Sequence, residues 1–280
     1  MRIRPDEVSG VLHPTNLTRY AARWIDPDPA VRDVVDAYWH VRWHLDEGEV
    51  VDQTIVDLPA VTLTVEAGDV PADLVVTGLH HRAWRRRIAG SGDVFAVRLR
   101  PAGLAVLSAL RPQDLVDATI PLTDGVDDRL RTFLTAVAVA RTPDDRARVA
   151  DALVAERVRA TPPSPVHLLA NRILDELRSR AYRQTGTPLA EHFAVSERTI
   201  QRALSATLGI GPKHAARRIR LQEAARAIAV HGDDDLAAIA VQLGYADQAH
   251  LTSDFRSATG VTPGAYRRQL ADLRQSGNAL

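Results

Sequence analysis

The last third of the chain repeats one pattern, in which a short apolar helix, a tight turn and a second helix follow one another. The first unit covers Pro188–Gly209 and the second covers Asp235–Gly260, so their starts are about 47 residues apart. Residues 217–230 between them have the pattern of one continuous helix. One such unit could belong to any helical bundle with a charged surface. Two units with the same layout, joined by one helix, predict a pair of helix-turn-helix motifs.

The second helix of each unit has suitable end residues and a polar outward face. Ser196 and Asp247 are good N-caps, because their side-chain oxygens can accept from free N–H groups of the first turn, and Gly209 suits a helix end. Arginine and glutamine match the edges of guanine and adenine in the major groove, so these faces favour double-stranded DNA as a partner. The outward residues concerned are Arg198, Gln201 and Arg202 in the first unit and Gln248, His250, Thr252 and Ser253 in the second.

The overall charge adds little, since 35 basic residues balance 35 acidic ones. From Asn171 onward, 15 arginines and lysines stand against 11 aspartates and glutamates, so the earlier part is mildly acidic. A basic region of this size is consistent with DNA binding but is not sufficient evidence for it.

The motifs of this region closely resemble the C-terminal domain of the AraC/XylS family of bacterial transcription regulators. The resemblance covers about Leu189 to Arg268 and rests on the segments AEHFAVSERTIQRAL, RIRLQEAARAI and IAVQLGYADQAHLTSDFRSATGVTPGAYRR. It implies a seven-helix domain whose two recognition helices enter successive major grooves on one face of DNA.

By position, the resemblance also assigns roles to side chains. The seven outward residues above would contact bases, while Ser196, Arg220 and Arg256 would contact phosphates, with intradomain ion pairs as the alternative for the two arginines. Ala249 and Ser253 are short, so the second helix is expected to contribute less base recognition than the first. RNA polymerase is a further expected partner, and transcription activation an expected outcome.

The N-terminal two-thirds have a different periodicity. Apolar and polar residues alternate in Tyr38–His44 and Asp93–Arg100, and Val56–Gly68 is rich in strand-forming residues. The segment DVFAVRLRPAGLAVL resembles one found in an uncharacterised group of N-terminal domains of such regulators. We therefore expect an α+β chain, with a mixed, β-rich, barrel-like domain and helices in residues 1–160, a linker at 161–165, and an all-α DNA-binding domain in 166–280 with its core at 189–268.

Such an N-terminal domain is expected to bind a small-molecule effector, to form a homodimer, or both. Aromatic residues with a histidine could line an effector pocket. The candidates for this pocket are Tyr38, Trp39, His40, Trp43 and Trp84.

Two alternatives stay open for the N-terminal part: a ligand- or metal-dependent enzyme, and a purely structural domain in a constitutive regulator. Cysteine chemistry is excluded because the chain has none. His40 and His44 are four residues apart on one predicted strand, about 13 Å, which is too far to share a metal ion. No catalytic motif stands out, so no catalytic residues, metal or cofactor are assigned.

The basic segment HHRAWRRR, His80 to Arg87, is the most arginine-rich stretch of the chain. It precedes the first helix-turn-helix unit by about 100 residues, so it is not expected to recognise bases. The three explanations considered are pairing with nearby acids on a solvated face, contact with an anionic ligand or with the other domain, and auxiliary contact with DNA phosphates.

The first residues, MRIRPDEVSG, lack the apolar core of a signal peptide, and no run reaches the 18–20 apolar residues of a membrane span. These features predict a cytoplasmic, nucleoid-associated protein with no membrane partner.

Overall fold

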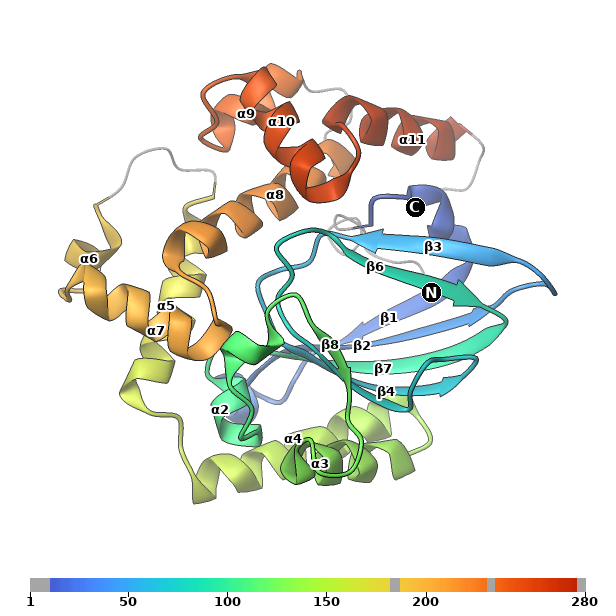
Figure 1. Ribbon diagram of the computed structural model, residues 1–280, viewed down its shortest axis with the longest axis vertical. Coiled ribbons are helices and arrows are strands. Elements are labelled where there is room, and N and C mark those ends of the chain that lie inside the picture. Colours follow the sequence, from blue (N-terminus) through green and yellow to red (C-terminus); the bar gives the residue numbers. More distant parts are fainter. Residues whose placement is uncertain (1–10, 182–186, 231–234, 276–280) are drawn as a thin grey trace.

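The computed structural model describes residues 11–181, 187–230 and 235–275, so the residues on which the absence of a signal peptide was judged lie outside the described part. Strands dominate up to Leu99 and helices dominate from Asp128 onward (Figure 1). The predicted α+β organisation is therefore confirmed.

An antiparallel sheet of six strands forms the centre of the N-terminal part (Figure 1). In order across the sheet, its strands are β1 (Tyr20–Ile25), β2 (Val35–His44), β7 (Ser91–Leu99), β4 (Thr62–Gly68), β5 (Leu74–Thr77) and β8 (Thr119–Pro121). A second, two-stranded sheet of β3 (Val50–Ile55) and β6 (Trp84–Ala89) packs on one face of the first. The described strands thus form two facing sheets and not a closed barrel. The expected β-rich, barrel-like domain takes this form.

Helices cover the other face of the six-stranded sheet (Figure 1). They are α2 (Gly103–Leu107), α3 (Asp128–Val139) and α4 (Pro143–Ala160), and Asp127 and Thr142 cap the last two by accepting backbone N–H groups. Tyr38 and Phe95 are fully buried in this core, with ring centroids 5.7 Å apart. These helices therefore bury the face of the sheet that carries Tyr38 and Phe95.

Strand β2 differs from the half-buried strand that its alternation predicts. Trp43 is buried against the two-stranded sheet, but Tyr38 on the opposite face is also buried, under the helices. Only the end of the strand, with Arg42 and His44 exposed, has the predicted polar face. Alternation alone does not reveal that helices cover the second face of the strand, where Tyr38 lies.

The C-terminal part consists of helices (Figure 1). They are α5 (Pro165–Ser179), α6 (Leu189–His192), α7 (Glu197–Leu208), α8 (Pro212–Val230), α9 (Leu236–Gln242), α10 (Gln248–Thr259) and α11 (Pro263–Gln275). Two of them extend beyond their predicted starts. Helix α8 begins at Pro212 rather than at 217, and α5 begins inside the expected linker, where Pro165 takes the first helical position and Ser164 caps it.

The two helix-turn-helix units repeat the same turn geometry. Val195 donates to the carbonyl of Ala190 and Tyr245 to that of Ala240, both at 2.9 Å. Ala194 has a φ of 53°, in the left-handed region, and Gly244 holds the equivalent place in the second unit with a φ of 75°. The duplicated layout predicted from the sequence is therefore present, with α8 joining the units.

Candidate nucleic-acid interface

The first candidate recognition helix, α7, presents three long polar side chains. Its large apolar residues, among them Ile200 and Leu204, are buried, whereas Arg198, Gln201 and Arg202 are exposed. This division follows from the helical period, which puts every third or fourth residue on the same face. The side chains predicted to read bases from this unit therefore share one solvent-facing surface.

Both ends of α7 are closed as its sequence predicts. The Ser196 hydroxyl accepts from the amide of Thr199 at 3.1 Å and lies 2.9 Å from the Thr199 hydroxyl. Gly209 ends the helix with a φ of 76°. Ser196 is exposed at the N-terminus of the helix, where the partial positive charge of the dipole favours an anion such as phosphate.

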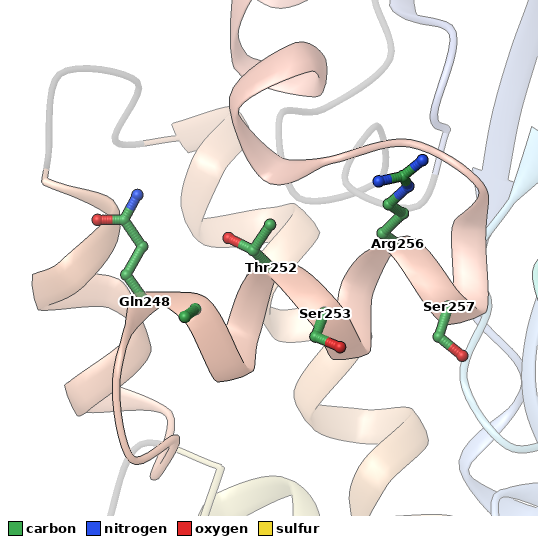
Figure 2. Close-up of a pocket in the computed structure, with 6 residues that line it drawn as sticks. Gln248, Thr252, Ser253, Arg256 and Ser257 are labelled. Atoms are coloured by element: carbon green, nitrogen blue, oxygen red, sulfur yellow. The ribbon is translucent and has the colours of Figure 1, made fainter.

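The exposed face of the second candidate recognition helix, α10, lines a shallow, open surface hollow of about 840 Å³ (Figure 2). Asp247 caps this helix by accepting from the amide of His250 at 2.7 Å. Leu251 and Phe255 anchor it from the buried side. The hollow is lined by Gln248, Ala249, Thr252, Ser253, Arg256 and Ser257.

Four of the residues predicted on α10 thus lie together, but His250 does not line the hollow. Its ring packs edge-on against Tyr245, with centroids 5.2 Å apart, next to the turn. Ser257 was not predicted, although it lies four residues after Ser253 on the same helical face. Extending the helical period by one turn identifies it.

Arg220 occupies a different environment from the other predicted phosphate ligands. Its guanidinium lies over the ring of Tyr245 at 5.3 Å, and its Nε is buried without a hydrogen-bond partner. The Tyr245 hydroxyl donates to Asp254, which also pairs with Arg217 at 2.7 Å. Arg220 is thus packed between α8 and the second unit, whereas Arg256 is exposed on the face of α10.

The structure does not bring the five candidate pocket residues together. Tyr38 lies under the helices and donates to Asp151 at 2.7 Å. Trp39 lies on the opposite face of the sheet, and its ring centroid is 5.0 Å from that of Trp24. Trp43, also on that face, donates to the carbonyl of Ala89 at 3.0 Å and contacts the Arg86 guanidinium. Trp84 lies on β6 and lines a separate cavity.

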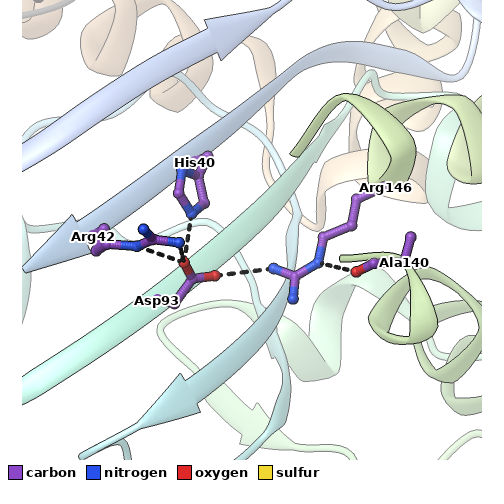
Figure 3. Close-up of polar contacts among 5 residues, drawn as sticks. All are labelled: His40, Arg42, Asp93, Ala140 and Arg146. Atoms are coloured by element: carbon purple, nitrogen blue, oxygen red, sulfur yellow. Dashed lines mark hydrogen bonds and ion pairs between the residues drawn. The ribbon is translucent and has the colours of Figure 1, made fainter. Parts of the chain in front are cut away.

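His40, the fifth candidate, belongs to a cluster of charged groups around Asp93 (Figure 3). Asp93 lies 2.7 Å from His40 Nε2 and pairs with Arg42 at 2.9 Å and Arg146 at 3.0 Å. The hydrogen bond from His40 lowers the pKa of the Asp93 carboxyl well below its usual range, and the two arginines act in the same direction. Arg146 also donates to the carbonyl of Ala140 at 3.0 Å, so the cluster ties the sheet to helices α3 and α4.

Neither a metal cluster nor a membrane span is found in residues 11–181, 187–230 and 235–275. No three histidine, aspartate or glutamate side chains in these ranges are grouped closely enough to hold an ion. None of the helices there combines the length and the apolar character needed to cross a bilayer.

The N-terminal part contacts both helix-turn-helix units. On the side of the first unit, the buried Asn171 of α5 donates to the carbonyl of Asp33 at 2.8 Å and accepts from the amide of Ala102 at 2.9 Å. Gln113 donates to the carbonyl of Ser205 in α7 at 2.6 Å. These partners are 69 or more residues apart in the chain, so no local pattern could identify them.

On the side of the second unit, Arg218 of α8 is 3% exposed and reaches into the N-terminal part. It forms an ion pair with the carboxylate of Asp57 and donates to the carbonyls of Asp57 at 3.0 Å and Arg82 at 3.1 Å. The amide of Ala83 donates to the carbonyl of Ala258, in the last turn of α10, at 2.8 Å. Leu12, Val56 and Ala83 also join the apolar core of this unit.

Comparisons with known proteins separate the same two regions. A family model described as a helix-turn-helix domain matches residues 189–269, and a model described as a domain of unknown function (DUF6597) matches residues 23–121. The transcriptional activator RhaS of Escherichia fergusonii is 36% identical over 80 residues, 29% of this chain and 28% of that protein. An AraC-like transcription regulator of Streptomyces antibioticus is 36% identical over 91 residues, 32% of this chain and 30% of that protein. The chain thus spans less than a third of the length of these relatives.

Two of the solved structures that match parts of this chain come from bacteria. The C-terminal domain of AraT, a response regulator from Geobacillus stearothermophilus, has 28% identity and a TM-score of 0.34, covering 38% of this chain and 85% of that one. Wild-type ToxT from Vibrio cholerae with bound unsaturated fatty acid has 11% identity and a TM-score of 0.40, covering 91% and 97%. The chain therefore carries a helix-turn-helix domain of the AraC type at residues 189–269, and a DUF6597 domain at residues 23–121 precedes it.

Proposed function

We propose that this protein is a sequence-specific DNA-binding transcription regulator whose N-terminal domain controls the binding. The observation that carries the proposal is the pair of capped helices, α7 and α10, with exposed polar faces, both inside the residues that match the helix-turn-helix domain. Arg198, Arg202 and Arg256 on these faces form no ion pair with any described residue, so their charges are available to DNA. Contacts to phosphates would set the register of the protein on the duplex, and side chains in the grooves would discriminate bases.

The domain boundaries and contacts proposed for this function are those expected from the sequence. Residues 166–280 would bind DNA, with Arg198, Gln201 and Arg202 as the principal base contacts and Gln248, His250, Thr252 and Ser253 as secondary ones. Ser196 and Arg256 are the favoured phosphate contacts. Arg220 is the exception to these expectations. Because its guanidinium packs over Tyr245, we assign it a role in the packing of α8 against the second unit and not a phosphate contact.

Further partners follow from the role of a regulator. The protein would act at the nucleoid, would contact RNA polymerase as an activator, and would respond to a small-molecule effector, to homodimerisation, or to both. Since a ligand shifts an equilibrium only by its different affinity for two states, an effector must bind differently to the DNA-bound and free forms. An enzymatic N-terminal domain remains the alternative; turnover of any small molecule by the purified chain would support it.

Replacing Arg202 with alanine is expected to weaken binding to the cognate site by about 1–3 kcal/mol and to relax one base preference. The cognate duplex is first obtained by selection from a randomised pool with the full-length chain. Binding of the variant to this duplex, and to a duplex of random sequence, is then measured by fluorescence anisotropy at one salt concentration.

Arg159 is the matched control, since it is exposed at the end of α4 and is remote in sequence from both units. Arg159→Ala should leave both affinities nearly unchanged. Equal losses on cognate and random DNA for Arg202→Ala would contradict base recognition by this residue and leave it only a phosphate contact.

A further inference from the structure

A cavity of about 290 Å³ lies beside the contact between the N-terminal domain and the second helix-turn-helix unit. It is built mainly from the segment HHRAWRRR, whose role the DNA-binding function leaves unexplained. Its volume is at the lower end of the range of small-molecule sites. The lining residues are His80, Arg82, Ala83, Trp84, Arg85 and Thr119.

The arginines of this segment differ in their partners. Arg86 donates twice to the buried carboxylate of Glu66, at 2.6 and 2.9 Å, and Arg87 pairs with Asp52 at 3.3 Å. Arg82 and Arg85 are exposed, and their guanidinium groups have no hydrogen-bond or ion-pair partner in the described ranges. The two arginines that line the cavity are thus the two whose charges are not neutralised by the protein.

An acidic group that contacts the same segment, Asp117, already has a partner. The Asp117 carboxylate accepts from the amide of His81 at 2.7 Å and lies 2.6 Å from its Nδ1. Two unpaired guanidinium groups beside one cavity repel each other, and an anion between them removes that repulsion while accepting charge-assisted hydrogen bonds. The electrostatics of the cavity therefore favour a negatively charged ligand.

The remaining lining indicates the shape of the ligand. Trp84 supplies an apolar surface next to the two charges. His80 uses Nδ1 to donate to the carbonyl of Gly78 at 3.0 Å, and its Nε2 has no hydrogen-bond partner among the described residues. A flat or apolar body bearing a carboxylate or phosphate matches this combination of groups.

The same segment is bonded directly to the DNA-binding domain. The carbonyl of Arg82 accepts from Arg218 of α8, and the amide of Ala83 donates to Ala258 of α10. The Arg85 guanidinium lies against Gly260, where α10 ends; a Cβ on that glycine would be 3.1 Å from Nη2. A ligand that draws Arg82 and Arg85 together would act on residues that hold both the linking helix and the second recognition helix.

We propose that this cavity is the effector site of the protein and that it binds a small organic anion, a carboxylate or phosphate ester with an aromatic or apolar body. The proposal rests on the function proposed above for the control it exerts, but anion binding itself can be tested without DNA. Binding and control are linked by reciprocity: whatever factor the anion applies to DNA affinity, DNA applies to anion affinity.

Binding is tested with the full-length chain by titration calorimetry and tryptophan fluorescence, with benzoate and phenyl phosphate as probes and benzyl alcohol as their uncharged counterpart. At least one anion is expected to bind saturably and to change the emission, and benzyl alcohol is not. Arg82→Gln and Arg85→Gln should each weaken binding about tenfold, the effect of losing one charge-assisted hydrogen bond. Trp84→Phe should retain binding by calorimetry but lose the change in emission.

Arg87→Gln is the matched control, because Arg87 lies on β6 with Arg85 but does not line the cavity. This substitution should leave the anion affinity unchanged. The site is overturned if neither anion binds, or if Arg82→Gln and Arg85→Gln bind like the unsubstituted chain. Equal DNA affinity with and without saturating anion would overturn the effector role.

A different partner for Arg82 and Arg85, DNA phosphate, has its own signature. The two variants would then weaken binding to all duplexes alike and lower the salt dependence by about one released counterion per arginine, with no anion binding by the free chain. That result contradicts the proposal. It would leave the proposed DNA-binding function intact, since base recognition by Arg202 is measured independently.

Discussion

Replacing Asp57 with alanine is expected to lower the free energy of unfolding by about 3 kcal/mol, because it leaves a buried cation without its counter-charge. Its partner Arg218 is 3% exposed on the side chain, so water cannot replace the lost carboxylate. The expected value is at the lower end of the usual range since the Asp57 side chain is itself 32% exposed. Chemical denaturation of the full-length chain measures the effect.

Asp52→Ala is the matched control for this substitution. Asp52 also pairs with an arginine, Arg87, but both side chains are more than 70% exposed, and such surface pairs contribute at most about 1 kcal/mol. Combining Asp57→Ala with Arg218→Met removes the buried charge and should recover much of the lost stability. Equal effects of Asp57→Ala and Asp52→Ala would show that the interdomain ion pair does not hold the domains together.

Replacing Gly209 with alanine is expected to cost about 3 kcal/mol of unfolding free energy. About 1 kcal/mol comes from the left-handed backbone, since φ is 76° and an L side chain is strained there. The rest, about 2 kcal/mol, comes from steric overlap with the N-terminal domain. A Cβ at this position would lie 2.8 Å from the carbonyl oxygen of Pro112 and 2.7 Å from Cγ2 of Val116.

Gly244 separates these two contributions. It has nearly the same backbone conformation, with a φ of 75°, but a Cβ there would meet no atom within 4 Å. Gly244→Ala should therefore cost only the conformational part, about 1 kcal/mol. The difference between the variants, measured by chemical denaturation, reports how tightly the end of α7 is packed against the N-terminal domain. No difference would mean that this contact is loose in solution.

The features of the DNA-binding units that the sequence predicts correctly are local ones. Ser196 and Asp247 cap α7 and α10 because a side-chain oxygen reaches an amide three residues away, whatever the rest of the fold does. The outward positions follow from the same helical period that buries Ile200 and Phe255. Such features depend on a few neighbouring residues, so the pattern alone determines them.

The features that the sequence does not predict depend on distant partners. In the sequence, Arg218 looks like an ordinary exposed arginine on a charged helix. In the fold it is buried and pairs with Asp57, which lies 161 residues earlier. Tyr38 and Trp39 are adjacent in sequence and were expected to share a pocket, but adjacent residues of a strand point to opposite faces of the sheet. Helices cover one of those faces and the two-stranded sheet packs on the other.

The segment HHRAWRRR combines two of the explanations considered for it. Arg86 and Arg87 pair with acids of neighbouring strands, as expected for a basic strand in an acidic domain. Arg82 and Ala83, at its start, use their backbone groups to contact the DNA-binding domain. The remaining charges, Arg82 and Arg85, are the basis for the proposed anion site.

The base sequences of the DNA sites selected by the protein test the central claim most directly. If α7 and α10 enter successive major grooves, the duplexes selected by the full-length chain should share two short base segments, centred about 10 base pairs apart. Selection repeated with Arg202→Ala should alter one segment, and selection with Gln248→Ala the other. A single continuous segment, or two variants that change the same bases, would contradict recognition by two helices.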